Sequence, residues 1–242
     1  MQLETYHNHE EQSNSAAELM IETIINKPNA VITLATGDSP KLAYQLFVEK
    51  VVEHGIDISQ VFFTGLDEWV DVAPTNPGSC HFFLHQYIFS PLKLSPSQYH
   101  LFKSAGETAE ADCQQMNQVL AAKGGIDLMV VGVGMNGHIG FNEPGASLEN
   151  EAHVAQLEPV TLQVGQKYFD GKTPIQKGMT LGLKQVMGAR TLLAMANGEK
   201  KASIIQTALE GTISNQVPIS LIRQHTNGIV MLDEAAASLL KN

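Results

Sequence analysis

Residues 126–145, IDLMVVGVGMNGHIGFNEPG, join a short apolar run to a glycine-rich loop. The apolar part, residues 126–131, has the length of a buried strand. His138 and Glu143 lie in the loop that follows it. The loops at the carboxyl ends of parallel strands carry the reactive groups of α/β enzymes, and an imidazole beside a carboxylate can move protons near neutral pH. The stretch predicts a proton-transfer loop at the edge of a sheet. The alternative is a solvated loop histidine with an incidental ion pair.

The rest of the chain repeats this pattern of short apolar runs between stretches with helical spacing. Strands are predicted at residues 30–35, 61–66, 126–131, 191–196 and 228–232, and helices at residues 15–26, 40–54, 79–88, 108–122, 177–187 and 198–210. Such alternation is typical of a parallel sheet that is covered on both faces. The predicted fold class is α/β: a doubly wound, mainly parallel, Rossmann-like sheet with helices on both faces, and residues 1–242 in a single domain.

Local signals predict where several helices begin and end. Ser15 and Glu18 have the spacing of a capping box, which favours a helix start at Ser15. Ser39 fits an N-cap and Pro40 fits the first helical position of the next helix, which Gly55 should end. These ends place the loops that border the sheet.

The charge and hydropathy of the chain exclude several classes of partner. Its 25 acidic and 15 basic residues give a formal net charge of -10, which argues against nucleic acid or an anionic membrane as partner. The longest apolar runs are strand-sized, far below the roughly 20 residues that span a bilayer. The polar residues 1–14 lack the basic-then-apolar order of a signal peptide. We therefore expect a cytoplasmic protein.

Cys80 and Cys113 are the only cysteines. Two cysteines without a Cys-x-x-Cys spacing are too few for a disulfide framework or a zinc site. We expect both to be structural thiols. A reactive Cys80 is the less favoured alternative, because nothing local marks it as activated.

Two strand ends carry features that suit an anion. In Thr36-Gly37-Asp38-Ser39-Pro40 a strand turns through glycine into a capped helix, whose backbone N–H groups and dipole can hold a phosphate. The alternative is an ordinary helix cap, and the carboxylate of Asp38 should point away from an anion. Residues 198–201, GEKK, place two lysines in the first turn of another helix. There the dipole disfavours cations, so an external anion would account for them, although a solvated surface pair remains the alternative.

Four segments together resemble the glucosamine-6-phosphate deaminase (glucosamine-6-phosphate isomerase) family, in order and at matching separations, from about residue 18 to residue 234. They are TGDSP at residues 36–40, LDEWV at residues 66–70, GHIGFNEP at residues 137–144 and GEKKA at residues 198–202. The histidine loop is the specific part. The other three would be weak signals singly.

The resemblance implies a doubly wound α/β sheet and an enzyme that converts glucosamine 6-phosphate and water into fructose 6-phosphate and ammonia, with no metal and no organic cofactor. It assigns Asp67 as the base that moves a proton from C2 to C1. It assigns His138, oriented by Glu143, as the group that opens the sugar ring, and places Asn136 beside this pair. Glu68 is left unassigned because strand alternation would point it elsewhere.

The resemblance also implies a small phosphosugar as the substrate. The residues that it assigns to the phosphate are Thr36, Gly37, Asp38, Ser39, Lys167 and Lys201. Lys167 would come from a mobile segment that closes over the site, and Lys201 would be a fixed cation.

The sequence departs from the family pattern in three ways. Family members often carry Asp at the position of Asn136, so we expect retained activity with a shifted pH profile. Lys167 stands where an arginine often sits, which replaces a bidentate fork by a point charge and affects substrate affinity. His153 and Ala155 occupy positions that bind effectors in allosteric hexamers, and the chain ends early at Asn242. We therefore expect no activation by an amino sugar and leave both a monomer and a homo-oligomer open.

Two other functions fit the same segments. A 6-phosphogluconolactonase-type hydrolase would use His138 to activate water against an ester carbonyl. A non-catalytic sugar-phosphate sensor would share the fold but would need neither Asp67 nor His138, and it would usually carry a DNA-binding segment.

Overall fold

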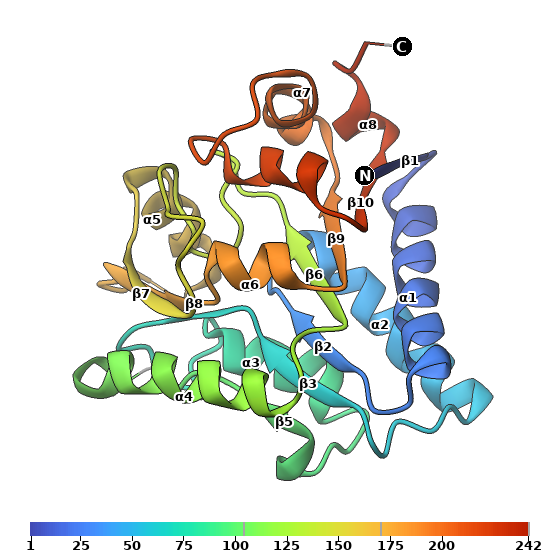
Figure 1. The fold of residues 1–242 in the computed structure, drawn as a ribbon, viewed down its shortest axis with the longest axis vertical. Coiled ribbons are helices and arrows are strands. Elements are labelled where there is room, and N and C mark those ends of the chain that lie inside the picture. The colour runs from blue at the N-terminus through green and yellow to red at the C-terminus, as the bar shows by residue number, and fades with distance from the viewer. Residues whose placement is uncertain (104, 170, 242) are drawn as a thin grey trace.

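A computed structural model describes residues 1–103, 105–169 and 171–241 of the chain, so Asn242 lies outside the described residues. Its centre is a seven-stranded sheet with the order β1-β10-β9-β6-β2-β3-β5, in which every pair is parallel. The strands are β1 (Gln2–Tyr6), β2 (Val31–Leu34), β3 (Phe62–Gly65), β5 (Tyr99–His100), β6 (Leu128–Gly132), β9 (Thr191–Ala196) and β10 (Gly228–Asp233). The five strands predicted from apolar runs are all present, and the predicted fold class is confirmed (Figure 1).

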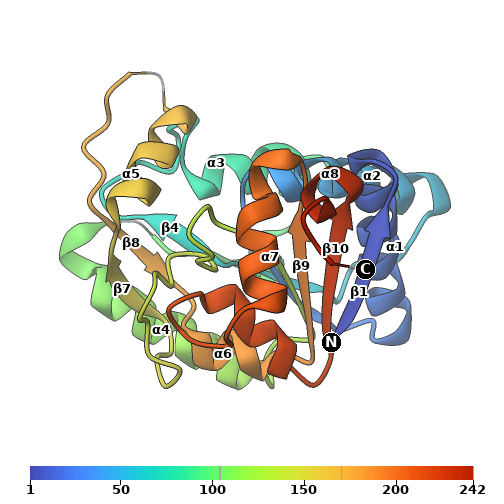
Figure 2. The ribbon, with the colours of Figure 1, turned by 90° about the horizontal axis from the view of Figure 1, so that it is seen from above.

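Helices cover both faces of this sheet. They are α1 (His9–Asn26), α2 (Asp38–His54), α3 (Cys80–Leu84), α4 (Ala109–Ala122), α5 (Pro159–Gly165), α6 (Leu183–Gly188), α7 (Ala202–Glu210) and α8 (Glu234–Ala237). Shorter turns are a π-helical turn (His85–Phe89) and 3-10 turns at Pro96–Gln98, Gly106–Thr108, Gln166–Tyr168, Glu199–Lys201 and Pro218–Gln224. Figure 2 shows α1 and α2 on one side of strands β9 and β10 and α7 on the other.

Alternate residues of each central strand point into two different cores. In β6, Leu128 and Val130 pack with α1, α2 and α3, whereas Met129 and Val131 pack with α4, α6 and α7. Side chains on a strand alternate between its faces, so a strand that is buried on both faces must be apolar throughout. This explains why continuous apolar runs marked the central strands.

The direction in which successive strands are added to the sheet reverses between β2 and β6. From β2 the sheet extends through β3 to β5 on one side, and through β6, β9 and β10 to β1 on the other. The loops that leave the carboxyl ends of β2 and β6 therefore diverge and open a crevice, which is where open α/β sheets bind ligands. The turn at Thr36 and the loop with His138 leave from these two ends.

A second, three-stranded antiparallel sheet lies beside the main one and consists of β4 (Asp67–Trp69), β8 (Lys177–Thr180) and β7 (His153–Gln156). The prediction of a helix over residues 177–187 was wrong for its first half. Residues 177–180 instead form β8, which pairs with β4 on one side and β7 on the other. Gly178 suits this strand: a Cβ there would stand 2.1 Å from the ring of Phe141. The helix begins only at Leu183.

Three predicted helix starts also differ from the structure. The first helix begins at His9, because Asn8 caps it by accepting from the backbone N–H of Glu11, so Ser15 lies inside the helix. The second helix begins at Asp38 with Gly37 as its N-cap, which places Ser39 and Pro40 inside its first turn. The α-helical turns of α7 begin at Ala202, after the 3-10 turn Glu199–Lys201. Gly55 ends the second helix in a left-handed conformation, as predicted.

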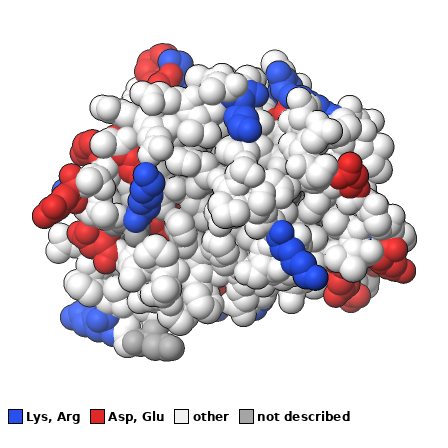
Figure 3. Space-filling view, turned by 90° about the horizontal axis from the view of Figure 1, so that it is seen from below, with Lys and Arg blue, Asp and Glu red and all other residues white. Residues whose placement is uncertain are grey.

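Charged side chains are dispersed over one face of the molecule. On the face drawn in Figure 3 they stand in small separate groups between neutral residues. Among the described residues, none of the helices has the length and apolar character needed to cross a membrane.

Candidate active site

A cavity of about 180 Å³ lies at the crevice between β2 and β6. It is lined by residues from the loops after β2, β6 and β9, from β4 and from α5. Of the residues proposed from the sequence, those in its wall are Thr36, Gly37, Asp38, Ser39, Asp67, His138, Lys167 and Lys201. Glu143 and Asn136 lie behind His138. The structure thus brings together groups that are up to 165 residues apart in the chain, as expected from the parallel topology.

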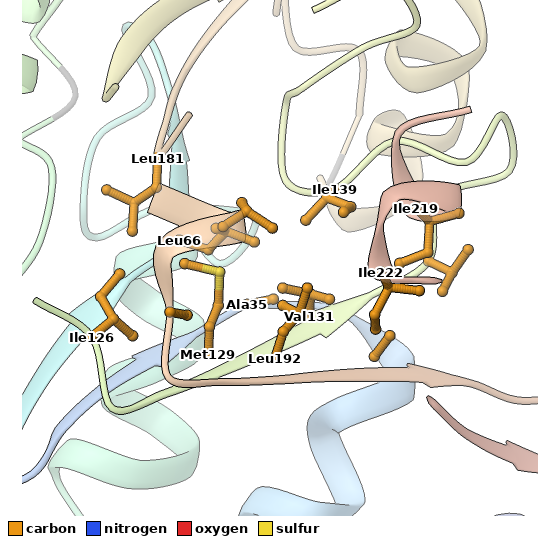
Figure 4. Packing of buried hydrophobic residues seen from close by; sticks show 14 of the residues in the cluster. Ala35, Leu66, Ile126, Met129, Val131, Ile139, Leu181, Leu192, Ile219 and Ile222 are labelled. Atoms are coloured by element: carbon orange, nitrogen blue, oxygen red, sulfur yellow. The ribbon is translucent and has the colours of Figure 1, made fainter. Parts of the chain in front are cut away.

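The histidine loop is a tight turn held in the core. The backbone N–H of Gly134 donates to the carbonyl of His138 at 3.1 Å, and the imidazole packs so closely on Gly134 that a Cβ there would stand 2.3 Å from the ring. Only glycine leaves room for this approach. Ile139, the next residue, is fully buried and points into the cluster that contains Leu66 and Val131 (Figure 4). The imidazole therefore packs against Gly134, and the burial of Ile139 anchors the loop that carries it.

Glu143 holds the inner nitrogen of the imidazole. Its Oε2 lies 3.4 Å from Nδ1 of His138 and accepts from the amide of Asn136 at 2.9 Å. The hydroxyl of Thr161 lies 3.2 Å from the same Nδ1. Burial alone would raise the pKa of Glu143, but hydrogen bonds from His138 and Thr161 outweigh it and lower this pKa to about 2. An ionised Glu143 accepts a hydrogen bond from Nδ1–H. This leaves Nε2 free to exchange protons with a ligand.

Asp67 begins β4, directly after β3, and its partly buried carboxylate lines the cavity. Burial raises its pKa to about 6, against opposing effects from a hydrogen bond with Cys80 and from His138. A carboxylate with a raised pKa near neutrality is suited to accept a proton and then return it. Glu68, the next residue, points away from the cavity into the protein and is almost fully buried.

Lysines and a helix N-terminus form the cationic end of the cavity. The ammonium of Lys201 donates to the carbonyl of Val133 at 2.5 Å, and burial, with the charge of Lys167, lowers its pKa to about 8. Lys167 instead pairs with Asp38 at 2.6 Å, at the exposed rim. Exposed pairs of this kind contribute at most about 1 kcal/mol, so a phosphate can compete for Lys167.

The turn after β2 supplies backbone donors rather than side chains. Gly37 has a φ of 122°, which only glycine adopts readily. It is the N-cap of α2, so the first turn of this helix borders the cavity. The hydroxyl of Ser39 donates to Asn197 at 2.6 Å, and that of Thr36 lies 3.3 Å from the sulfur of Cys80. The carboxylate of Asp38 faces Lys167 and solvent, so the backbone N–H groups of the first helical turn are what this turn offers an anion.

Several residues of the site were missed by the sequence interpretation. Cys80 and Trp69 line the cavity, and Thr161 contacts His138. Cys80 was expected to be a structural thiol, and it is indeed free and buried, but its position beside Asp67 depends on the tertiary packing of α3. Lys200, proposed as an anion ligand with its neighbour, is exposed and lies outside the cavity lining.

Two further points concern effectors and metals. Ala155 is buried in β7, and Nδ1 of His153 lies 2.9 Å from the carbonyl of Glu151. The expectation that no amino sugar activates the protein stays a prediction. Within the described ranges, no group of three or more His, Cys, Asp and Glu side chains could hold a metal ion.

Taken as a whole, the cavity pairs two proton-transfer groups with a cationic end. Asp67 and the His138–Glu143 pair reach the cavity from different loops, and Lys201 lies at its cationic end. An anionic substrate of sugar size would thus be held by one end while protons move at the other.

Comparison with known proteins agrees with this geometry. Residues 7–231 match the family described as glucosamine-6-phosphate isomerases/6-phosphogluconolactonase. The chain is 41% identical over 231 residues to AgaI of Escherichia coli (strain K12), whose name gives a deaminase activity as provisional; the match covers 96% of this chain and 91% of that protein. It is 34% identical over 234 residues to the glucosamine-6-phosphate deaminase of Thermoanaerobacter pseudethanolicus (strain ATCC 33223 / 39E), covering 96% and 92%.

Among solved structures, a monomeric glucosamine-6-phosphate deaminase superposes with a TM-score of 0.95 at 31% sequence identity, and the match covers 99% of this chain and 100% of that one. The family match, the curated relatives and this structure extend over nearly the whole chain, and the family match includes every residue of the cavity lining. The chain therefore belongs to the glucosamine-6-phosphate isomerase/6-phosphogluconolactonase family.

Proposed function

We propose that this protein is a glucosamine-6-phosphate deaminase, which converts glucosamine 6-phosphate and water into fructose 6-phosphate and ammonia. The observation that carries the proposal is the shared cavity of Asp67 and His138 with Lys201. The likeness to deaminases over nearly full length supports the same reaction. Such an enzyme acts in amino-sugar metabolism, and the cytoplasmic location of this protein stays a prediction.

Ring opening is the first step. Nε2 of His138 takes the proton of the anomeric hydroxyl and returns a proton to the ring oxygen as the C1–O5 bond breaks, which yields the open-chain aldehyde. Glu143 accepts from Nδ1 and stabilises the imidazolium that forms between the two transfers. Asn136 holds Glu143 through its amide, which supplies orientation without a second negative charge.

Isomerisation and loss of ammonia follow. Asp67 removes the proton from C2, the C1 oxygen takes a proton from the substrate's own ammonium group, and an enolamine forms. The same carboxyl group then delivers a proton to C1, so that C2 becomes an imine. Water adds to the imine carbon and the C2–N bond breaks, which releases ammonia and leaves the ketone of fructose 6-phosphate. One carboxyl with a pKa of about 6 can serve both transfers, because it gains and loses its proton easily near neutral pH.

Measuring ammonia and fructose 6-phosphate after incubation with glucosamine 6-phosphate tests the proposal. The two products should appear in equal amounts. A lactonase would instead hydrolyse 6-phosphogluconolactone without releasing ammonia from the amino sugar, and a sensor would bind the phosphosugar without turnover. Either result would overturn the deaminase assignment.

The pH dependence of kcat/KM should be bell-shaped, with limbs near pH 6 and pH 8. Below its pKa of about 6 Asp67 is protonated and cannot accept the C2 proton, and above its pKa of about 8 Lys201 loses the charge that attracts the phosphate. Initial rates at low substrate concentration give this profile. The Lys201→Arg variant stays charged and should lose the alkaline limb, apart from any titration of the substrate. An unchanged alkaline limb would contradict the role of Lys201.

The two phosphate lysines should differ in their effects. Because Lys201 is half-buried, its charge is less screened than that of Lys167, and Lys201→Met should raise KM by about 100-fold with little change in kcat. Lys167 is half-exposed and paired with Asp38, so Lys167→Met should raise KM by about tenfold or less. Lys200→Met, which removes an exposed neighbouring charge, is the control and should leave KM unchanged. A larger effect at Lys167 than at Lys201 would reverse this assignment.

A further inference from the structure

Asp67 needs a hydrogen-bond donor, because a partly buried carboxylate without one is costly to ionise. Among the residues that the structure describes, Cys80 is the side chain that donates to the carboxylate of Asp67, and its sulfur lies 3.6 Å from Oδ1. A sulfur donor is longer and weaker than an oxygen donor, but it acts here in the interior, where competing water is scarce. Cys80 therefore stands in the place from which the proposed base can be held.

Glu68 fixes the position of Cys80. Its Oε1 accepts the backbone N–H of Cys80 at 3.1 Å, and its Oε2 accepts that of His81 at 2.8 Å. The side chain of Ser79 accepts the next one, from Phe82. The first three backbone N–H groups of α3 are thus satisfied, and Glu68 accepts two of them. The base and its donor are tied together through one dipeptide, Asp67-Glu68.

The direction of the thiol proton follows from its two neighbours. An ionised Asp67 can only accept, whereas the hydroxyl of Thr36, 3.3 Å from the sulfur, can donate to it. Burial, together with the negative charges of Glu68 and Asp67, raises the pKa of Cys80 well above its usual value, so the thiol keeps its proton. The chain of donors then runs from Thr36 through Cys80 to Asp67, from the proposed phosphate turn to the proposed base.

We propose that Cys80 is a positioning residue whose thiol keeps the carboxylate of Asp67 ionised and aimed at the cavity, while Glu68 holds Cys80 in place through the first turn of α3. This inference rests on the proposed deaminase function. The inference assigns Glu68, whose role strand alternation left open, to holding Cys80. It assigns Cys80 to holding the base, a role for which the thiol must stay unreactive.

The test is the acid limb of the kcat/KM profile in Cys80 variants. Without the donor, Cys80→Ala should move this limb upward by about half a unit to one unit, because a hydrogen bond to the ionised form lowers a carboxyl pKa. Activity should then fall severalfold more at pH 6 than at pH 8. Cys80→Ser keeps a hydroxyl donor and should restore the limb at least in part. The other titratable groups recorded near Asp67 are His138, Glu68 and Tyr44, and no variant alters them.

Cys113→Ala is the matched control. Cys113 is equally buried, but it lies in α4 and belongs to a different apolar cluster from Cys80. Both alanine variants should lose stability, but only Cys80→Ala should move the acid limb. The substrate's own titrations are the same in every variant. A limb that stays in place in Cys80→Ala, or that moves equally in Cys113→Ala, would overturn the inference.

A second measurement does not depend on turnover. Titration of Asp67 by NMR, with ¹³C-labelled aspartate carboxyls, should show a higher pKa in Cys80→Ala than in the wild type. If wild-type protein releases no ammonia, the proposed function fails, yet this titration still decides whether Cys80 holds Asp67. If ammonia is released and neither the limb nor the titration moves, only the inference about Cys80 fails.

Discussion

Replacing Asp67 by asparagine is expected to reduce turnover of glucosamine 6-phosphate by about 10³-fold or more, because an amide cannot take the C2 proton. In deuterated water the wild type should place deuterium at C1 of fructose 6-phosphate, and the variant should not. Binding of the phosphosugar, measured by calorimetry on the inactive variant, should stay close to the wild-type KM, because Lys201 and the first turn of α2 are untouched. Deuterium incorporation at the wild-type rate would exclude Asp67 as the base.

The same substitution should stabilise the folded protein at alkaline pH. Burial raises the pKa of Asp67 to about 6, above the usual value for an unfolded chain, so ionising it costs folding free energy. This cost is absent below about pH 4, where the group is protonated in both states, and complete above about pH 6. Asp67→Asn should therefore raise the free energy of unfolding at pH 8 by about 1–3 kcal/mol.

A surface carboxylate provides the control for that stability gain. Asp57 precedes β3, is exposed, and its pKa is lowered by hydrogen bonds with the backbone N–H and side chain of Ser59. Asp57→Asn also removes one negative charge but should give no gain at pH 8. Denaturant unfolding of both variants at pH 4 and pH 8 separates the two cases. An equal gain in both would attribute the effect to net charge rather than to burial of the base.

Replacing His138 by glutamine is expected to slow turnover by about 10²- to 10³-fold, because ring opening loses its proton relay. Glutamine keeps a hydrogen-bonding side chain of similar length but cannot carry a proton between two oxygens. Glu143 and Asn136 remain paired in the variant, so the loop should keep its shape. Steady-state ammonia release gives the overall loss.

Anomer exchange separates His138 from Asp67. Opening and closing the ring interconverts the anomers of glucosamine 6-phosphate, a reaction that needs the imidazole but not the base at C2. NMR exchange with substrate labelled at C1 should show enzyme-catalysed interconversion in Asp67→Asn and none in His138→Gln. If His138→Gln still accelerates the exchange, or if Asp67→Asn abolishes it, the division of labour between the two residues is wrong.

The sequence was sufficient to predict those elements whose signal lies in a continuous run of neighbouring residues. Strands such as β6 and β9 are buried on both faces, so their unbroken apolar runs identify them. The short strands β4, β7 and β8 carry no such run and are fixed by pairing with one another, so a helix was predicted where β8 lies. The edge strand β1 was missed for the same reason, because its mixed pattern resembles a polar terminus.

The functional site divides in the same way. Asp67 and His138 could be named because each follows a recognisable strand in a specific segment. Cys80 and Thr161 could not, because each reaches its partner through a helix whose placement depends on tertiary packing. The N-cap of α2 was also missed: it is Gly37, with its positive φ, two residues before the predicted N-cap Ser39. For the phosphate turn, the backbone donors that the motif suggested are therefore those of a helix whose N-cap is Gly37.

Trp69 gives the cavity a built-in optical reporter. It is the single tryptophan of the chain, it lines the cavity, and its indole lies 4.6 Å from the ring of Phe141 and 5.9 Å from that of Phe169. Any ligand that fills the cavity changes the polarity around this indole, so intrinsic fluorescence reports occupancy without a label. Stopped-flow recordings of that signal would resolve substrate docking from the slower chemical steps.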